Sequence, residues 1–281
     1  MNDIKDLIGY IDDVIQRYMP ESVYPEVIYE AMGYSLFGGG KRIRPRLMIA
    51  SCELVGGDRA FIEPLFSALE MIHTYSLIHD DLPCMDDDDY RRGKPTSHRV
   101  FGEANAVLAG DALLNLAYET LFKGYLEVEN KSSYNKACLI LSQAAGCGGM
   151  VGGQTADLQN DETCRDEKIL KFIYSNKTGA LIRAGILCGA LSADISAEKF
   201  DRLDNFSRCL GMLFQLTDDI LDMDGENPEQ GKATYAALLG KEGCLEIINK
   251  YLNQANDALE IFGQSASELK NMAMEIAVRN N

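Results

Sequence analysis

The sequence contains two groups of aspartates whose spacing suits a divalent cation. The first, DDLPCMDDDD, begins at Asp80, directly after the apolar segment MIHTYSLIH. Pro83 interrupts a helix, so the chain is expected to turn there and to bring Asp86 back towards Asp80. Carboxylate oxygens are the ligands that Mg²⁺ prefers, usually together with waters and substrate phosphates. Taken alone, however, such an acidic run is more typical of a solvated loop.

The second group lies in the segment FQLTDDILD. Gln215, Asp218, Asp219 and Asp222 follow one another at helical offsets of zero, three, four and seven, so a helix would present them on one face. The apolar residues between them indicate that this helix packs inside the protein. No cation stands four residues away to offset the repulsion between the carboxylates. Metal binding is therefore the better explanation of this stripe.

Basic residues are concentrated in two short segments, GGGKRIRPR and YRRGK, although the net charge of the chain is −16. The overall charge argues against a nucleic-acid or anionic-membrane surface, whereas a local basic cluster indicates an anion site. Either segment alone could equally be a solvated loop. Combined with the acidic groups, they predict diphosphates bridged to carboxylates by Mg²⁺ and held by Arg and Lys. His73 lies seven residues before Asp80, on the same helical face, although a lone histidine is usually a core residue.

Helices must position these residues. Apolar residues recur at spacings of three and four along most of the chain, and no clear run of alternating β-branched residues is found. The breaks are short, and no linker or repeat marks a second domain. Helices are expected at about 4–18, 25–37, 45–56, 60–79, 102–123, 133–151, 166–191, 196–223, 232–252 and 254–279. The sequence thus predicts an all-α, single-domain bundle of about ten helices over residues 1–281.

The chain shows no sign of export or membrane insertion. No apolar stretch reaches the roughly 20 residues of a membrane-spanning helix, and the start MNDIKDLIGY lacks the features of a secretion signal. The eight cysteines are scattered without a CxxC pair, which favours reduced, structural thiols. We expect a soluble, cytoplasmic protein with no membrane span.

Six segments occur in the order seen in the polyprenyl diphosphate synthases. They are GGGKRIRP, SLIHDDLPCMDDDDYRRGKPTSH, GGQTADL, NKTGALI, FQLTDDILD and GKATYAALLG. The resemblance runs from about Gly38 to Gly240 and is closest to bacterial-type farnesyl diphosphate synthases, in which two extra residues separate Asp81 from Asp86. It implies the all-α isoprenoid synthase fold around a deep central cavity, isoprenoid diphosphates as substrates, Mg²⁺ as cofactor and, usually, a homodimer.

The resemblance also assigns roles to matching positions. The diphosphate of isopentenyl diphosphate would be held by Lys41, Arg44, His73 and Arg92. The allylic diphosphate would be contacted by Arg91, Lys177 and Lys232. Three Mg²⁺ ions per active site would bind to Asp80, Asp86 and Asp218, with Asp81, Asp219 and Asp222 as further candidates. The developing carbocation would face the catalytic candidates Lys177, through its carbonyl, Thr178 and Gln215.

The resemblance further links product length to the residues just before the first aspartates. Tyr75, five positions before Asp80, is a bulky aromatic that would stop growth early, whereas the neighbouring Ser76 is small. This favours farnesyl diphosphate, with 15 carbons, as the product. The alternative interpretation of Tyr75 is an ordinary core residue of an amphipathic helix. Products of 10 or 20 carbons therefore stay open.

One segment departs from the family pattern. Between the second aspartate group and Thr234 the chain is about ten residues shorter than in family members, so one phosphate-binding lysine is missing. Lys232 matches the second of the two family lysines or, as the alternative, the first. A true deletion should weaken binding of the allylic diphosphate. Two rival functions fit the sequence less well. A non-catalytic regulatory subunit typically lacks one aspartate group, but both are present here. A terpene cyclase would not need the two basic segments that serve a second diphosphate.

Overall fold

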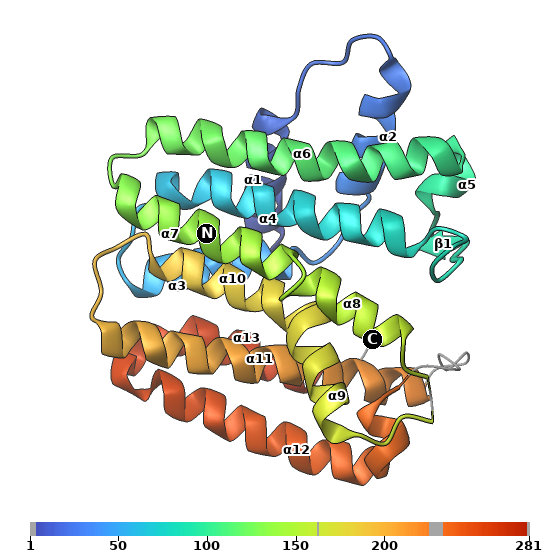
Figure 1. Cartoon of the computed structure of the whole chain (residues 1–281). Coiled ribbons are helices and arrows are strands. Elements are labelled where there is room, and N and C mark those ends of the chain that lie inside the picture. The colour runs from blue at the N-terminus through green and yellow to red at the C-terminus, as the bar shows by residue number, and fades with distance from the viewer. Residues whose placement is uncertain (1–3, 162, 225–232, 280–281) are drawn as a thin grey trace. The chain divides into compact units, whose positions relative to one another are not determined.

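The computed structural model describes residues 4–161, 163–224 and 233–279 (Figure 1). Its residues are 78% helical, which confirms the all-α class. The contacts divide the chain into two compact units. Unit 1 comprises Met1–Arg46 and Arg59–Tyr134, and unit 2 comprises Leu47–Asp58 and Asn135–Asn281. Each unit is described by itself, and the single-domain organisation stays a prediction.

Unit 1 is built around one long, deeply buried helix. Its elements are α1 (Ile4–Tyr18), α2 (Glu26–Leu36), α4 (Arg59–Asp80), β1 (Tyr90–Arg91), β2 (Lys94–Pro95), α5 (Ser97–Phe101) and α6 (Glu103–Glu127). Two further helices, α3 (Ile43–Leu54) and α7 (Lys131–Ala145), cross the boundary between the units. Apolar side chains from Phe61 to Ile78 are buried on most sides of α4, and α6 packs along it (Figure 1). This burial fixes the direction in which the carboxyl end of α4 presents Asp80.

A short hairpin follows the first aspartate group. Tyr90 pairs with Pro95, and Arg91 pairs with Lys94. The two turn residues both have positive φ, 53° at Arg92 and 75° at Gly93, as the turns of two-residue hairpins require. Strands of two residues carry too little alternation to be recognised in the sequence. The hairpin places the basic segment YRRGK on a rigid turn.

Unit 2 is a helical layer with a buried centre. Its elements are α8 (Met150–Leu158), α9 (Glu167–Ile173), a π-helical turn η1 (Tyr174–Thr178), α10 (Gly179–Ala190), α11 (Ala197–Asp224), α12 (Tyr235–Leu259), a 3₁₀ segment η2 (Glu260–Ala266) and α13 (Ser267–Ala277). Nearly every side chain of α10 is buried, and α10 and α12 both pack against α11 (Figure 1). The helix carrying the second aspartate group is therefore held in the interior, as its apolar neighbours predict.

Three expected helices are divided in the structure. The expected helix at 254–279 begins within α12, which runs past residue 252 to Leu259, and the 3₁₀ segment η2 then separates α12 from α13. The expected helix at 133–151 is interrupted between Ala145 and Met150, where Gly149 has non-helical backbone angles of φ −133° and ψ −129°. A side chain at this position would collide with the carbonyl oxygen of Ala144, so the turn requires glycine. The expected helix at 166–191 contains the π-helical turn η1. Over the residues that the structure describes, none of the helices combines the length and the hydropathy needed to cross a membrane.

Candidate functional site

The first aspartate group forms a tight turn at the carboxyl end of α4. The backbone N–H of Asp86 donates to the carbonyl oxygen of Asp80 over 2.9 Å, and the N–H of Met85 donates to the carbonyl oxygen of Leu82 over 2.8 Å. The predicted return of Asp86 towards Asp80 is thus confirmed. Both aspartates are partly exposed. The backbones of the two aspartates are therefore close together at a helix end that solvent can reach.

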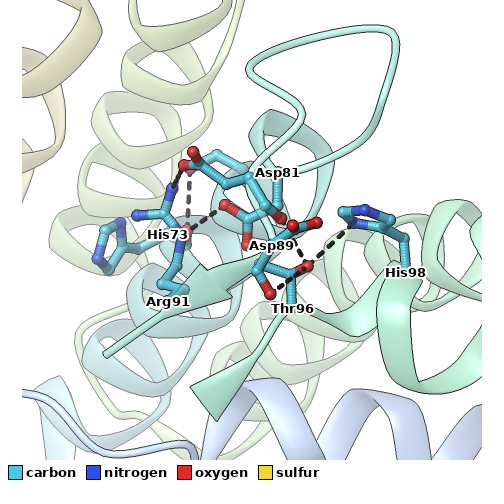
Figure 2. A network of polar contacts seen from close by, with 8 residues as sticks. His73, Asp81, Asp89, Arg91, Thr96 and His98 are labelled. Carbon is cyan, nitrogen blue, oxygen red and sulfur yellow. Dashed lines mark hydrogen bonds and ion pairs between the residues drawn. The ribbon is translucent and has the colours of Figure 1, made fainter. Parts of the chain in front are cut away.

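The neighbouring Asp81 is buried and paired with the hairpin. Arg91 donates through Nε to Asp81 Oδ1 at 2.6 Å and through Nη2 to Asp88 Oδ2 at 3.4 Å (Figure 2). Burial raises the pKa of Asp81 to about 6, although Arg91 acts in the opposite direction. The hairpin is fixed in turn by Thr96, whose hydroxyl donates to the Asp88 carbonyl oxygen over 2.7 Å. Asp81 and Arg91, which the sequence assigned to different roles, therefore lie in direct contact.

An arginine cluster surrounds His73 on α4. Arg44 Nη1 donates to His73 Nε2 over 3.1 Å. Burial, together with the positive charges of Arg44, Arg92, Arg91 and Arg42 in decreasing order, holds the pKa of His73 well below its usual value. The imidazole is therefore neutral at pH 7. We use "arginine cluster" for these four residues.

The Gly-rich loop and the hairpin meet at this cluster. Arg92 donates through Nη1 to the carbonyl oxygen of Gly39. Gly40 has a φ of 133°, a backbone conformation that favours glycine, and a side chain there would also displace the Arg92 guanidinium, whose Nη1 would lie 2.7 Å away. Lys41, the next residue, is exposed. The structure thus places Arg44, His73 and Arg92, which were predicted for one diphosphate, near Arg91, which was predicted for the other.

A small pocket of about 50 Å³ lies beside the cluster in unit 1. Arg91 and Arg92 line one part of it, and Thr74, Leu77 and Asp81 line another. Its lining combines guanidinium groups with apolar side chains of α4. At this volume the pocket can hold a few water molecules but not a prenyl chain.

The polar face of α11 in unit 2 holds its carboxylates differently. Asp219 is buried, and its Oδ2 accepts hydrogen bonds from the Tyr174 hydroxyl and, over 3.0 Å, from the N–H of Tyr235. Burial raises the pKa of Asp219 to about 7. Tyr235 is the first residue of α12, so Asp219 places a negative charge at the amino terminus of that helix. One carboxylate therefore joins α11, η1 and α12.

Asp218 interacts with the carboxyl end of the chain. Arg279 donates through Nη2 to Asp218 Oδ1 and, over 2.9 Å, to the Phe214 carbonyl oxygen. Its guanidinium carbon also lies 4.1 Å from the centroid of the Phe214 ring. Asp222, one turn further along α11, is exposed. Nothing in the sequence near Arg279 signals this contact.

The π-helical turn η1 carries two of the predicted catalytic residues. Its widened hydrogen bond runs from the N–H of Gly179 to the carbonyl oxygen of Tyr174. Thr178 donates through its hydroxyl to Gln215 Oε1, and Lys177 forms an ion pair with Asp157. Thr178 and Gln215 are thus brought together as predicted. Asp157 is not among the residues predicted from the sequence. It lies in the segment GGQTADL, and only its pairing with Lys177 in the structure marks it out.

The candidates for product length lie near the end of α4. Tyr75 is 8% exposed, and its ring is edge-on to the ring of His79 at a centroid distance of 5.7 Å. Burial raises the pKa of Tyr75 to about 12. Ser76 donates through its hydroxyl to the His73 carbonyl oxygen over 2.9 Å. Tyr75 is therefore a packed aromatic, while Ser76 satisfies its hydroxyl within the helix.

The carboxylates provide the donor chemistry that Mg²⁺ requires. Within the described ranges, no group of three or more His, Cys, Asp or Glu side chains is arranged to hold a metal ion by itself. Mg²⁺ is commonly bound by one or two carboxylates together with phosphates and waters. The partly exposed Asp80 and Asp86 fit that kind of site. Lys232 lies outside the described residues, so its predicted role is not addressed by the structure.

Comparison with known proteins identifies related chains. The family model described as polyprenyl synthetase matches residues 25–276. Geranylgeranyl pyrophosphate synthase 9, chloroplastic, of Arabidopsis thaliana is 44% identical over 273 residues, which cover 92% of this chain and 75% of that protein. A dimethylallyltranstransferase of Fischerella ambigua is 42% identical, with 99% of this chain and 84% of that protein covered.

Solved structures show the same likeness. The apo structure of an FPP/GFPP synthase from Zymomonas mobilis has a TM-score of 0.89 and 36% identity, and covers 98% of this chain and 97% of its own. A geranyltransferase from Legionella pneumophila has a TM-score of 0.89 and 33% identity, with 99% and 96% covered.

Proposed function

The chain belongs to the polyprenyl synthetase family, and we therefore propose that it joins isopentenyl diphosphate head to tail to an allylic diphosphate. The product that we propose is farnesyl diphosphate, with release of diphosphate. Prenyl transfer follows from the family, whereas the product length and the roles of single residues are proposals.

The observation that carries the proposal is the arginine cluster around His73. Two members of the arginine cluster are paired with carboxylates, Arg42 with Asp12 and Glu70, and Arg91 with Asp81 and Asp88. Arg44 instead donates to the neutral imidazole of His73, and Arg92 donates to the carbonyl oxygen of Gly39. These two guanidinium groups can therefore place positive charge beside an anionic ligand. Guanidinium groups also match the oxygen geometry of phosphates. A diphosphate satisfies both requirements.

We assign the diphosphate of isopentenyl diphosphate to Lys41, Arg44, His73 and Arg92. Arg44 and His73 are already within hydrogen-bond distance of each other, so a ligand oxygen could bond to both without large rearrangement. The imidazole of His73 is neutral without a ligand. A bound anion beside it would raise its pKa back towards the ordinary value. This part of the site would orient the nucleophilic double bond.

We assign the allylic diphosphate to Arg91, Lys177 and Lys232. Mg²⁺, when bound through Asp80, Asp86 and Asp218, would supply positive charge for the departing diphosphate; Asp81, Asp219 and Asp222 are further candidates. The allylic C–O bond breaks, and its electron pair leaves with the diphosphate. Thr178, the Lys177 carbonyl and Gln215 would face the resulting carbocation and stabilise it by their dipoles.

The new bond forms when the double bond of isopentenyl diphosphate attacks the allylic carbon. The cation that results loses a proton to the released diphosphate, which restores a double bond. No side chain is needed as general base in this scheme. Apolar walls that exclude water would protect the carbocation from capture. The chain therefore acts by positioning and by electrostatics.

A 15-carbon product is supported by the packing of Tyr75. The ring is buried on α4, five residues before Asp80, where a bulky side chain would limit the length of a growing product. A 20-carbon product is the alternative, because the Arabidopsis relative is named a geranylgeranyl pyrophosphate synthase. A 10-carbon product and a regulatory role without catalysis are the remaining alternatives.

We also propose a homodimer, supported by an apolar face of α6. Leu108, Phe122 and Leu126 are 54%, 71% and 78% exposed, which is unusual for large apolar side chains that share one helix. A cytoplasmic location stays a prediction. Light scattering on purified protein would test the dimer, and Phe122→Glu should shift the mass to that of one chain.

Product analysis tests the proposed function. Purified protein would be incubated with Mg²⁺, isopentenyl diphosphate and either dimethylallyl or geranyl diphosphate, and the dephosphorylated products would be separated by chromatography. Mainly farnesol is expected from both primers. Absence of Mg²⁺-dependent condensation with either primer would overturn the proposal.

A variant separates product length from catalysis. Tyr75→Ala should shift the products towards 20 carbons, because the bulky side chain is removed. Phe66→Leu, which also loses volume from the buried face of α4, is the matched control and should leave product length unchanged. Unchanged products in Tyr75→Ala would leave the enzyme class standing and remove Tyr75 as the limit.

A further inference from the structure

Arg42 lies between Lys41 and Arg44 in the basic segment, but its side chain is buried. The side chain is 1% exposed. Its Nε donates to Asp12 Oδ1 over 2.8 Å, its Nη1 to Glu70 Oε1 over 2.7 Å, and its Nη2 to the Leu36 carbonyl oxygen over 2.6 Å. All three nitrogen atoms of the guanidinium therefore have partners within the protein. Two of those partners are carboxylates, so its charge is compensated internally.

The backbone at Arg42 adopts a conformation that few side-chain-bearing residues take. Its φ is 47°, after values of 94° at Gly39 and 133° at Gly40. A residue other than glycine in this region is strained and persists only where its surroundings hold it. The three hydrogen bonds of the Arg42 side chain are the interactions that can hold it.

The strained turn leads directly into α3. The carbonyl oxygen of Arg42 accepts the N–H of Arg46 over 3.0 Å, a bond of the first helical turn. Arg44 belongs to that same turn and reaches His73 at 3.1 Å. The position of Arg44 therefore depends on how Arg42 is fixed.

The partners of Arg42 and Arg44 share one helix. Glu70 and His73 are three residues apart on α4, so they lie on the same face. Arg42 contacts Glu70, and Arg44 contacts His73. Two parallel contacts set the register of the loop against α4, and Asp12 adds a third anchor from α1.

We propose that Arg42 is a positioning residue for the diphosphate site: with Asp12 and Glu70 it holds the turn at residues 39–42 and thereby places Arg44 beside His73. The inference rests on the proposed function for the identity of the ligand. Arg42 does not contact the ligand, and its compensated charge attracts no anion. N-terminal helix α1 thus takes part in substrate binding through Asp12.

The structure offers a matched control for a purely structural role. Arg17 and Glu63 form another ion pair between α1 and α4, at 3.2 Å, which does not reach the Gly-rich loop. Arg17→Gln removes that pair and should leave ligand binding unchanged. This variant shows how far the loss of one ion pair between α1 and α4 changes Tm, Kd and KM when the Gly-rich loop is not involved.

The test compares Arg42→Gln, Arg42→Lys, Asp12→Asn and Arg17→Gln with the unaltered chain. Calorimetry would give Kd for inorganic pyrophosphate and isopentenyl diphosphate, steady-state kinetics would give KM for each substrate, and thermal unfolding would give Tm. Arg42→Gln should raise Kd and the KM for isopentenyl diphosphate at least tenfold while the KM for the allylic substrate changes less than twofold. Asp12→Asn, whose carboxylate is 38% exposed, should give a smaller change of the same kind in a folded protein.

Arg42→Lys separates position from charge. A lysine keeps the charge but cannot form three hydrogen bonds with the same fork geometry, so we expect the KM for isopentenyl diphosphate to stay at least fivefold raised. Recovery of the original KM by Arg42→Lys would overturn the proposal, as would an unchanged KM in Arg42→Gln or Asp12→Asn despite a lower Tm. If Arg42→Gln does not fold, Asp12→Asn and Arg42→Lys decide by the same criteria. Failure of the unaltered chain to bind either ligand would instead overturn the proposed function itself.

Discussion

The two polar clusters compensate their charges in different ways. In unit 1 two arginines of the cluster, Arg42 and Arg91, are paired with carboxylates, whereas Arg44 donates to the neutral His73 and Arg92 to the Gly39 carbonyl oxygen. In unit 2 the groups of the polar face of α11 are matched with one another: Asp218 with Arg279, Asp219 with Tyr174, and Gln215 with Thr178. The first arrangement favours an anion from outside. The second is satisfied internally and must exchange partners before it can bind a ligand.

The largest expected effect falls on the cluster in unit 1. Arg44→Ala should raise the Kd for pyrophosphate by about 10- to 100-fold, because a hydrogen bond to a charged group contributes about 1.5–3 kcal/mol. Calorimetry measures this change. Arg99→Gln, which removes an exposed ion pair with Asp89 in the same unit, is the control and should bind as the unaltered chain does. Equal affinity in Arg44→Ala would show that the cluster is not the anion site.

The matching change in unit 2 should affect stability. Tyr174→Phe removes the hydroxyl that donates to the buried Asp219, and we expect the free energy of unfolding to fall by about 1–3 kcal/mol. Denaturation by urea measures it. Tyr10→Phe removes a hydrogen bond of 2.7 Å to the partly exposed Glu63 and should cost less. A loss of pyrophosphate affinity in Tyr174→Phe, without a loss of stability, would contradict the distinction between the two regions.

The pH dependence of stability should report on His73. Its folded-state pKa is lowered by burial and by Arg44, Arg92, Arg91 and Arg42, so below about pH 6.5 the unfolded chain binds the proton more readily. This contribution to stability is present above pH 6.5 and is lost as the pH falls, by at most about 1.4 kcal/mol per pH unit.

The raised pKa values of Asp81 and Asp219 act in the opposite direction. The useful quantity is therefore the difference between the unaltered chain and His73→Gln, measured by urea denaturation from pH 7.5 to 5.5. We expect the unaltered chain to lose stability relative to the variant as the pH falls. Parallel curves for the two proteins would show that His73 is not held neutral.

The smallest expected effect concerns Arg279. Arg279→Gln removes the ion pair with Asp218, and such partly exposed pairs contribute up to about 1 kcal/mol. The Mg²⁺ concentration needed for half of the maximal activity should therefore fall by up to about fivefold. Arg208→Gln, which breaks a surface pair with Asp204, provides the control. A higher Mg²⁺ requirement in Arg279→Gln would mean that Arg279 supports the site.

The sequence predicts the helices and the first aspartate turn well, because both depend on local features. Apolar periodicity reports which side of a helix is buried, and Pro83 forces the chain to turn. The break before Met150 occurs at Gly149, whose backbone is non-helical, and the glycines of this segment were a visible signal for it.

Partners that are distant in the sequence could not be predicted. Arg279 reaches Asp218 across 61 residues, and the burial of Arg42 depends on carboxylates from two other helices. In the sequence Arg42 resembles its neighbours Lys41 and Arg44, because residue type alone does not tell a buried cation from a ligand-binding one. The partners of the Arg42 side chain in the folded protein distinguish it from Lys41 and Arg44.

The π-helical turn η1 has a consequence for how this chain can change in length. A π-helical turn holds one residue more than an α-helical turn would, and one residue corresponds to about 100° of rotation along an α-helix. Deletion of Ser175 would therefore restore a regular α-helix but rotate one part of it relative to the other. Either Lys177 and Thr178 or the buried side chains of α10 would then turn away from their present neighbours. A single in-frame deletion here should therefore be far less tolerated than any conservative substitution. The number of residues in η1 is thus as important to the site as the side chains that it carries.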